Sequence, residues 1–217
     1  MPQQEHAFEK TITKHAKLDY LLYLPPDYEA QASWPLILFL HGRGERGADL
    51  ALVQKHGLAK CIAAGDDFPF IIVSPQCPAS SYWTEETDAL AALLDEVIAT
   101  YKADPQRVYL TGLSMGGRGT WFLAGRYPDR FAAIAPICGA GLNWFAVERL
   151  NKLPTWIFHG DADQTVPVYE AQNMAGWLRE VGGNVKLTIY PGVDHDSWTE
   201  TYNNPELYNW FLSHTRA

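Results

Sequence analysis

The sequence predicts an α/β protein in which a mostly parallel, doubly wound sheet is flanked by helices. Two observations indicate this class. Short apolar segments alternate with amphipathic segments along the 217 residues, as in repeated strand–helix–strand units. The apolar segments are continuous, which is typical of strands buried on both faces of a parallel sheet. A chain of this length has room for one domain, and we expect residues 1–217 to form a single one.

Seven apolar segments rich in Ile, Leu, Val and Phe are expected to form the strands. In chain order they are Leu18–Leu24, Leu36–Leu40, Phe70–Val73, Val108–Thr111, Ala132–Ile137, Thr155–Phe158 and Lys186–Tyr190. Because helical segments separate most of them, we expect right-handed crossovers between parallel strands.

Four amphipathic segments are expected to form helices: Glu85–Tyr101, Gly116–Arg126, Glu170–Val181 and Pro205–Ser213. The first has the spacing of a helix with one buried face, as at Leu90 and Leu94. We expect Thr84 to cap its N-terminus. The second stops before Pro128, and the third ends at Gly182, residues that terminate helices for steric and conformational reasons.

Composition excludes several classes of protein. Hydrophobic residues make up 47% of the chain, too many for a disordered protein. No apolar segment reaches the ~18–20 residues of a membrane-spanning helix. The net charge of −8 argues against nucleic acid as the main partner, because surfaces that bind it are usually basic. We therefore expect a small-molecule substrate, no nucleic acid and no membrane partner, and either a monomer or a dimer.

The three cysteines, Cys61, Cys77 and Cys138, are too few and too scattered for a disulfide scaffold. None forms a Cys-x-x-Cys pair, so we expect no metal site, and their odd number favours a reducing compartment. The first residues, MPQQEHAFEKTITKH, lack the apolar segment of a signal peptide. These features predict a cytoplasmic protein, with a secreted origin left open if a leader has been removed.

The strongest local signal is the run Gly112-Leu113-Ser114-Met115-Gly116, a Gly-x-Ser-x-Gly pattern. The pattern alone is weak, but here it directly follows a predicted strand and directly opens a predicted helix. That sharp turn projects the serine hydroxyl above the sheet, and glycines flank it because side chains would collide with the neighbouring strand and helix. We expect Ser114 to be a nucleophile; the alternative is an ordinary glycine-rich turn.

A serine hydroxyl needs a base within hydrogen-bond reach. Of the seven histidines, His195 lies in a polar loop after the last predicted strand, where ligands bind in open α/β sheets. We expect His195 to be this base. His41 and His159 precede glycines at strand ends and are expected to shape loops.

The base in turn needs a carboxylate to orient it. The loop after the sixth predicted strand offers Asp161 and Asp163. We favour Asp163, because Asp161 directly follows a glycine and is expected to cap its own turn. Asp194 and Asp196 are too close in sequence to His195 to be the first choice.

Two backbone amides are needed to bind the oxyanion of an acyl-transfer intermediate. One is expected from Met115, which follows the nucleophile. The other is expected from Arg43 in the HGRGERG loop after the second predicted strand, with Gly42 or Gly44 as alternatives. The glycines of this loop allow the backbone to approach a substrate.

From about Leu18 to Leu212, the chain resembles proteins of the α/β-hydrolase fold. The motifs that carry the resemblance are Leu40-His41-Gly42, Gly112–Gly116, His159-Gly160 with Asp163 and Val166-Pro167, and Asp194-His195. The HGRGERG loop, Pro75–Pro78 with Trp83, and the tail Asp196–Tyr208 are similar to single-domain phospholipase/carboxylesterase-like esterases. That branch, often called predicted peptidases, is related to feruloyl and polyhydroxybutyrate esterases. The resemblance implies ester hydrolysis by a serine without a cofactor. Close relatives of dienelactone hydrolase use a cysteine, so Ser114 disfavours that activity.

The expected site is shallow. Many α/β-hydrolases carry a cap domain between two late strands, but here only Cys138–Leu153 separates them, too little for a multi-helix cap. Loop residues at the predicted catalytic edge are then expected to contact the substrate: Trp83, Trp144, Trp198 and His41. For each indole ring, packing within a loop is the alternative.

These residues together predict a serine carboxylesterase that forms an acyl-enzyme with short-chain or aryl esters. A peptidase, thioesterase or acyltransferase on the same triad is the first alternative. A binding protein that has kept the fold without chemistry is a remote one.

Overall fold

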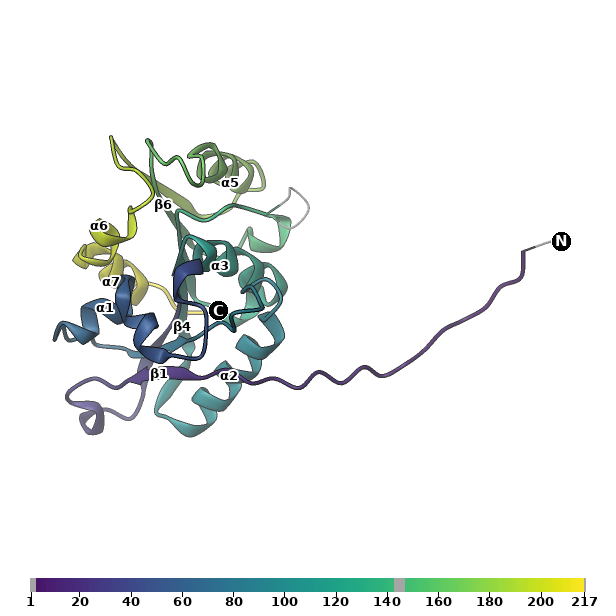
Figure 1. Ribbon diagram of the computed structural model, residues 1–217, viewed down its shortest axis with the longest axis horizontal. Helices are drawn as coiled ribbons and strands as arrows, with labels where there is room; N and C mark the ends of the chain where they lie inside the picture. The colour runs from purple at the N-terminus through teal and green to yellow at the C-terminus, as the bar shows by residue number, and fades with distance from the viewer. Residues whose placement is uncertain (1–2, 143–146, 217) are drawn as a thin grey trace.

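The computed structural model describes residues 3–142 and 147–216, and its core is one seven-stranded sheet (Figure 1). The strands are β1 (Tyr20–Tyr23), β2 (Trp34–Leu40), β3 (Ile71–Pro75), β4 (Ala103–Leu113), β5 (Ala133–Ile137), β6 (Thr155–Gly160) and β7 (Val185–Tyr190). They lie in the order β1-β3-β2-β4-β5-β6-β7, and only β1 is antiparallel to its neighbour. The predicted mostly parallel α/β sheet is therefore confirmed, and each predicted strand overlaps one of these seven.

Helices cover both faces of this sheet (Figure 1). They are α1 (Gly57–Ala63), α2 (Thr87–Thr100), α3 (Met115–Arg126), α5 (Tyr169–Glu180), α6 (Trp198–Tyr202) and α7 (Pro205–Leu212). Buried residues of α2, α3 and α5 share one hydrophobic cluster with alternate residues of β2, and those of α1, α6 and α7 share a second cluster with the intervening residues. This alternation follows from the two-residue repeat of a strand, which sends successive side chains to opposite faces.

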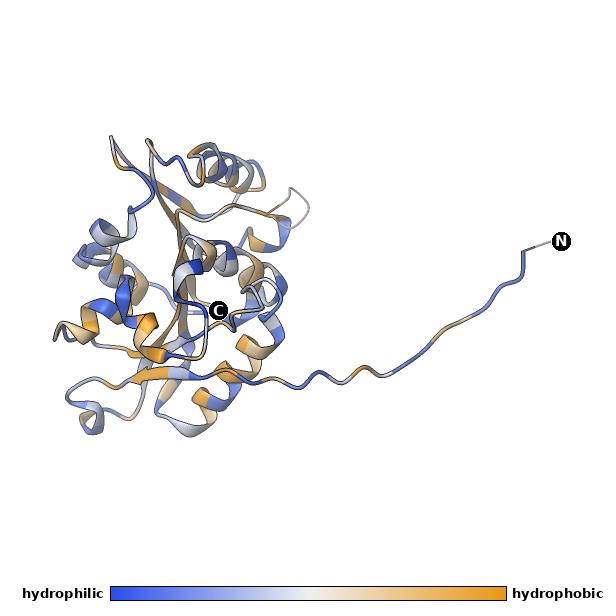
Figure 2. Cartoon of the chain, viewed as in Figure 1, coloured by the Kyte–Doolittle hydropathy of each residue, from blue (hydrophilic) through white to orange (hydrophobic). Residues whose placement is uncertain are grey.

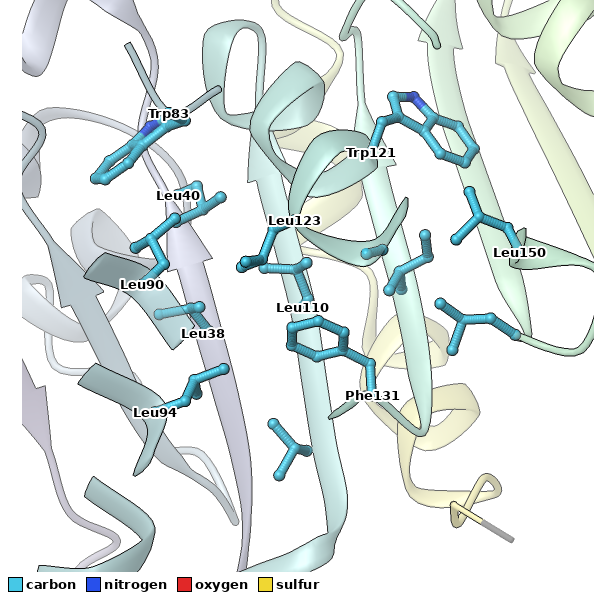
Figure 3. Close-up of a cluster of buried hydrophobic side chains, with 14 of the residues drawn as sticks. Leu38, Leu40, Trp83, Leu90, Leu94, Leu110, Trp121, Leu123, Phe131 and Leu150 are labelled. Atoms are coloured by element: carbon cyan, nitrogen blue, oxygen red, sulfur yellow. The ribbon is translucent and has the colours of Figure 1, made fainter. Parts of the chain in front are cut away.

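The first of these clusters fixes α3 against the centre of the sheet. Figure 3 shows leucines of β2 and β4 beneath side chains from α2 and α3. The labelled strand residues are Leu38, Leu40 and Leu110, and the labelled helix residues are Leu90, Leu94, Trp121 and Leu123. All seven are fully or almost fully buried. Because α3 begins directly after β4, this packing holds the β4–α3 turn in place.

The sheet register brings several loops to one edge. At the carboxyl ends of the strands, Leu40 pairs with Gly112, Leu113 with Ile137, and Gly160 with Tyr190. The loops that follow β2, β4, β6 and β7 therefore start side by side. This edge is where ligands bind in open α/β sheets.

The expected cap at Thr84 is wrong, because α2 begins three residues later, at Thr87. Residues 83–85 form a turn instead. The Ser81 hydroxyl donates its one proton to Glu86 Oε1 at 2.6 Å and lies 3.2 Å from Glu85 Oε2. The Glu85 amide donates to the Tyr82 carbonyl at 2.9 Å, which closes a turn just before the helix.

Residues 3–19 form an extended arm that leaves the sheet at β1 (Figure 1). Phe8 and Ile12 on this arm are 88% and 87% exposed. Figure 2 shows hydrophobic segments interrupting a mainly hydrophilic arm. Among the helices of residues 3–142 and 147–216, none is long and apolar enough to cross a membrane.

Candidate active site

Ser114 occupies the sharp turn between β4 and α3. Its backbone has φ +54° and ψ −114°, a conformation that costs free energy for any residue with a side chain. The Ser114 amide donates a hydrogen bond to the Ile137 carbonyl at 2.9 Å, and its carbonyl accepts one from the Arg118 amide at 3.0 Å. The end of β5 and the first turn of α3 therefore hold the strained residue from both sides.

The glycines around Ser114 are required by close backbone contacts. A Cβ atom on Gly116 would lie 1.9 Å from the Leu40 carbonyl oxygen, and one on Gly112 would lie 2.6 Å from the Gly116 carbonyl oxygen. Real Cβ contacts are never this short, and the atoms that would have to move belong to the backbone. The Gly-x-Ser-x-Gly pattern is thus a steric requirement of placing α3 directly on the end of β2.

The structure brings the three residues Ser114, His195 and Asp163 together in one chain of hydrogen bonds. His195 Nδ1 lies 2.7 Å from Asp163 Oδ2, and His195 Nε2 lies 2.8 Å from Ser114 Oγ. Because a carboxylate can only accept, Nδ1 carries the ring proton, and Nε2 accepts the proton of the serine hydroxyl. This tautomer is the one in which an imidazole acts as a base toward the hydroxyl.

Asp163 is held in its ionised form. Burial acts to raise the pKa of its carboxyl, but the hydrogen bond from His195 and those from the Val166 and Thr165 amides more than offset this, so the pKa is lowered. Both amides donate to Oδ1 at 2.8 Å, which leaves Oδ2 for His195. At neutral pH the carboxylate can therefore both orient the imidazole and stabilise its protonated form.

The other aspartates near His195 fasten its loop. Asp161 Oδ1 accepts a hydrogen bond from the Gly192 amide at 2.6 Å, so the expectation that Asp161 caps its own turn is wrong. Asp194 Oδ1 accepts from the Gln164 and His195 amides, at 3.0 and 2.8 Å. Both carboxylates join the loop after β6 to the loop after β7, because these loops leave neighbouring parallel strands.

The two residues expected to bind an oxyanion follow the ends of the neighbouring strands β2 and β4. Met115 is the first residue of α3, and Arg43 is an exposed residue in the short 3₁₀ turn Arg43–Glu45 that follows β2. The loop around Arg43 is fixed by Gln76, whose Nε2 donates to the Glu45 carbonyl at 2.8 Å. The Gly47 amide also donates to the Cys77 carbonyl at 3.0 Å.

The expectation that Trp83 and His41 contact a substrate is wrong, because both side chains are buried. Trp83 is 0% exposed and donates from Nε1 to the His41 carbonyl at 2.9 Å. His41 Nδ1 donates to the Gly42 carbonyl at 2.6 Å, and its Nε2 accepts from the Cys77 amide at 3.0 Å. Burial lowers the pKa of His41 to about 4, so the ring is neutral. Through these hydrogen bonds, both residues stabilise the start of the glycine-rich loop at His41 and Gly42.

Trp198 lies against the imidazole of His195. The two ring centroids are 5.4 Å apart and the planes are perpendicular. Trp198 also contacts the ring of His56, with 5.7 Å between the centroids, and no sequence pattern predicted this contact. Trp144, the remaining expected contact, lies outside the described residues.

A small cavity of about 130 Å³ adjoins Trp198, lined also by Cys61, Tyr202 and Asn203 among others. A larger cavity, of about 610 Å³, is lined by Ala132 and Pro154, which directly precede β5 and β6. It lies at the amino ends of these strands, whereas Ser114 follows the carboxyl end of β4. The larger cavity is therefore separate from the candidate active site.

The sheet, the strained serine turn and the chain of hydrogen bonds at the carboxyl ends of the strands define the class of protein, an α/β-hydrolase. β5 ends at Ile137 and β6 begins at Thr155, which leaves too short a segment for a multi-helix cap. The chain belongs to the dienelactone hydrolase family, whose sequence model matches residues 77–209.

Individual relatives support this assignment. A bifunctional acetylxylan esterase/xylanase from Neocallimastix patriciarum is 28% identical over 202 residues, which cover 88% of this chain and 28% of the relative. A poly(3-hydroxyalkanoate) depolymerase C from Paucimonas lemoignei is 31% identical over 142 residues, covering 58% of this chain and 32% of the relative. A solved structure described as a thermostable esterase superposes with a TM-score of 0.80 at 34% identity, covering 92% of this chain and 60% of that one. This chain therefore spans about three tenths of the length of the two curated relatives.

Proposed function

We propose that this protein is a serine carboxylesterase that hydrolyses short-chain or aryl carboxylic esters through an acyl-enzyme. The observation that carries the proposal is the placement of His195 Nε2 2.8 Å from Ser114 Oγ, with Asp163 on the opposite ring nitrogen. A serine hydroxyl is a weak nucleophile unless a base removes its proton during attack. The strained turn around Ser114 also presents its hydroxyl at the open edge of the sheet.

The reaction proceeds in two steps. Ser114 Oγ attacks the ester carbonyl while His195 Nε2 takes the hydroxyl proton, and the negative charge that develops on the carbonyl oxygen is bound by the amides of Met115 and Arg43. His195 then gives its proton to the departing alcohol, which leaves an acyl group on Ser114. Water, deprotonated by His195, attacks this acyl group; His195 then returns the proton to Ser114 Oγ as the carboxylic acid leaves, which regenerates the serine.

Two observations favour small esters as substrates. β5 ends at Ile137 and β6 begins at Thr155, too short a separation for a multi-helix cap that would enclose a long acyl chain over Ser114. The edge-on contact between Trp198 and His195 places an apolar surface directly beside the proposed base. The names of two similar proteins, an acetylxylan esterase/xylanase and a thermostable esterase, favour esters over peptides.

Hydrolysis of p-nitrophenyl esters from acetate to decanoate, with methyl ferulate alongside, tests this proposal. We expect kcat/KM to be highest between acetate and butyrate and to fall by about tenfold or more at decanoate, because no cap encloses the extra methylenes. A maximum at decanoate would contradict the proposed preference for short acyl groups. Absence of hydrolysis for every ester in the series would contradict the esterase assignment itself.

A further inference from the structure

A second histidine, His159, touches the carboxylate of the triad. It lies in β6, where it pairs with Ile189 of β7, and it is 0% exposed. Its Nε2 atom lies 3.2 Å from Asp163 Oδ2 and 2.8 Å from the Val166 carbonyl oxygen. Asp163 Oδ2 therefore faces two imidazole rings, because His195 Nδ1 approaches the same oxygen to 2.7 Å.

The hydrogen-bond partners of His159 determine which of its ring nitrogens carries the proton. A carbonyl and a carboxylate can only accept, so the proton of the neutral ring must be on Nε2. The other nitrogen, Nδ1, is buried and has no hydrogen-bond partner in the structure. A donor placed there would find no acceptor, which is costly. The N–H on Nε2 is donated to the Val166 carbonyl, and Asp163 Oδ2 lies 3.2 Å from the same nitrogen.

The hydrogen bond of His159 supports the loop that holds the carboxylate. The Val166 carbonyl accepts from His159, while the Val166 amide donates to Asp163 Oδ1 at 2.8 Å. The Thr165 amide donates to the same oxygen at 2.8 Å. His159 therefore anchors, from the rigid strand β6, the loop whose two amides hold Asp163.

We propose that His159 is a positioning residue: its hydrogen bond to the Val166 carbonyl holds the loop whose two amides bind Asp163 Oδ1, and so keeps Oδ2 directed toward His195. This role rests on the proposed function, because it acts through the triad. Without the His159 donor, this loop loses its tie to β6, and Asp163 holds the His195 imidazole less firmly. The protonated imidazole that forms during the reaction is then stabilised less.

Other ionisable groups surround this pair and must be considered in any pH experiment. They are Asp161, Asp194, Asp196, Cys138 and, beyond Trp198, His56 with Glu45. The three aspartates accept hydrogen bonds from backbone amides, and burial raises the pKa of the Cys138 thiol to about 12, which keeps it neutral. None of them changes when residue 159 is replaced, so they act equally in all variants compared below.

Three substitutions of His159 test the proposal. The amide nitrogen of Gln reaches the position of Nε2, so His159→Gln keeps the donor, whereas the amide of His159→Asn reaches only the position of Nδ1, where no partner lies. His159→Phe keeps the ring shape without a donor. We expect His159→Phe and His159→Asn to lower kcat for p-nitrophenyl acetate about tenfold with little change in KM. His159→Gln should retain most of the wild-type kcat. The acidic limb of the kcat/KM profile should move to lower pH in His159→Phe and His159→Asn alone, because a less firmly held carboxylate stabilises the protonated His195 less.

Thermal unfolding and the NMR titration of the His195 imidazole complete the test. The titration does not depend on ester hydrolysis, so it remains informative even if the protein cleaves no ester, an outcome that would contradict the proposed function alone. We expect the midpoint of the His195 titration to move to lower pH in His159→Phe and His159→Asn and to stay at the wild-type position in His159→Gln. An unchanged His195 titration in a folded Phe variant would overturn the proposal. Equal losses of kcat in His159→Gln and His159→Phe would also overturn it, because the shape of the side chain and not its N–H donor would then be responsible.

Discussion

Replacing Ser114 by Ala is expected to lower kcat/KM for p-nitrophenyl acetate by about 10⁴-fold or more, because the variant has no nucleophile to form an acyl-enzyme. The folded structure should persist, since the Ser114 amide and carbonyl make the backbone hydrogen bonds that hold the turn. Steady-state kinetics at pH 7.5 with thermal unfolding of the same samples provide the measurement, since together they separate lost chemistry from lost folding.

The matched control for this substitution is His195→Ala, alone and combined with Ser114→Ala. Because the two residues act as one unit, the double variant should be no less active than either single one. Substantial activity in folded Ser114→Ala would mean that another group attacks the ester. If the fold losses in kcat/KM of the two single variants multiplied in the double variant, serine and histidine would act independently.

The second large effect is expected on stability, from Gly116→Ala. A Cβ atom at this position would lie 1.9 Å from the Leu40 carbonyl oxygen and 2.8 Å from the His41 carbonyl oxygen. Both oxygens belong to the backbone at the end of β2, so α3 would have to move off the sheet. We expect a loss of about 3 kcal/mol or more in the free energy of unfolding, which corresponds to a fall of roughly 6–12 °C in Tm.

Gly176→Ala in α5 is the control for Gly116→Ala. A Cβ atom on Gly176 meets nothing within 4 Å, so the substitution tests glycine-to-alanine exchange in a helix without a steric clash. It should leave stability unchanged or raise it by up to about 1 kcal/mol, because alanine has the higher helix propensity. Equal stability of the Gly116→Ala and Gly176→Ala variants would contradict the close approach of α3 to β2.

The fold was predictable from the sequence because its strands are buried on both faces. Continuous apolar runs such as Leu36–Leu40 have no exposed face in a doubly covered sheet, so they stand out from the amphipathic helices. The short helices α1 and α6 were not predicted, since seven and five residues are too few to show a helical repeat. β4 begins five residues before the predicted start, at Ala103, in a polar stretch that has no apolar pattern.

The residues of the candidate active site differ in how far sequence could locate them. Ser114, Asp163 and His195 follow strand ends, and parallel strands bring such ends to one edge of the sheet, so their proximity follows from topology. The position of Trp83 depends instead on a buried carbonyl that accepts its indole N–H, which no local pattern reveals. The contact of His159 with Asp163 likewise depends on the turn that folds the loop back over the end of β6.

The measurement that most directly tests the central claim is the mapping of a covalent adduct. Diethyl p-nitrophenyl phosphate reacts with an activated serine, whose oxygen attacks phosphorus and expels p-nitrophenolate, leaving a diethylphosphoryl group on the enzyme. We expect intact-mass spectrometry to show one such group per chain, located by peptide mapping on Ser114, and none on the Ser114→Ala variant. Labelling of another residue at the same rate, or no labelling of folded wild-type protein, would contradict the assignment of Ser114 as the activated nucleophile.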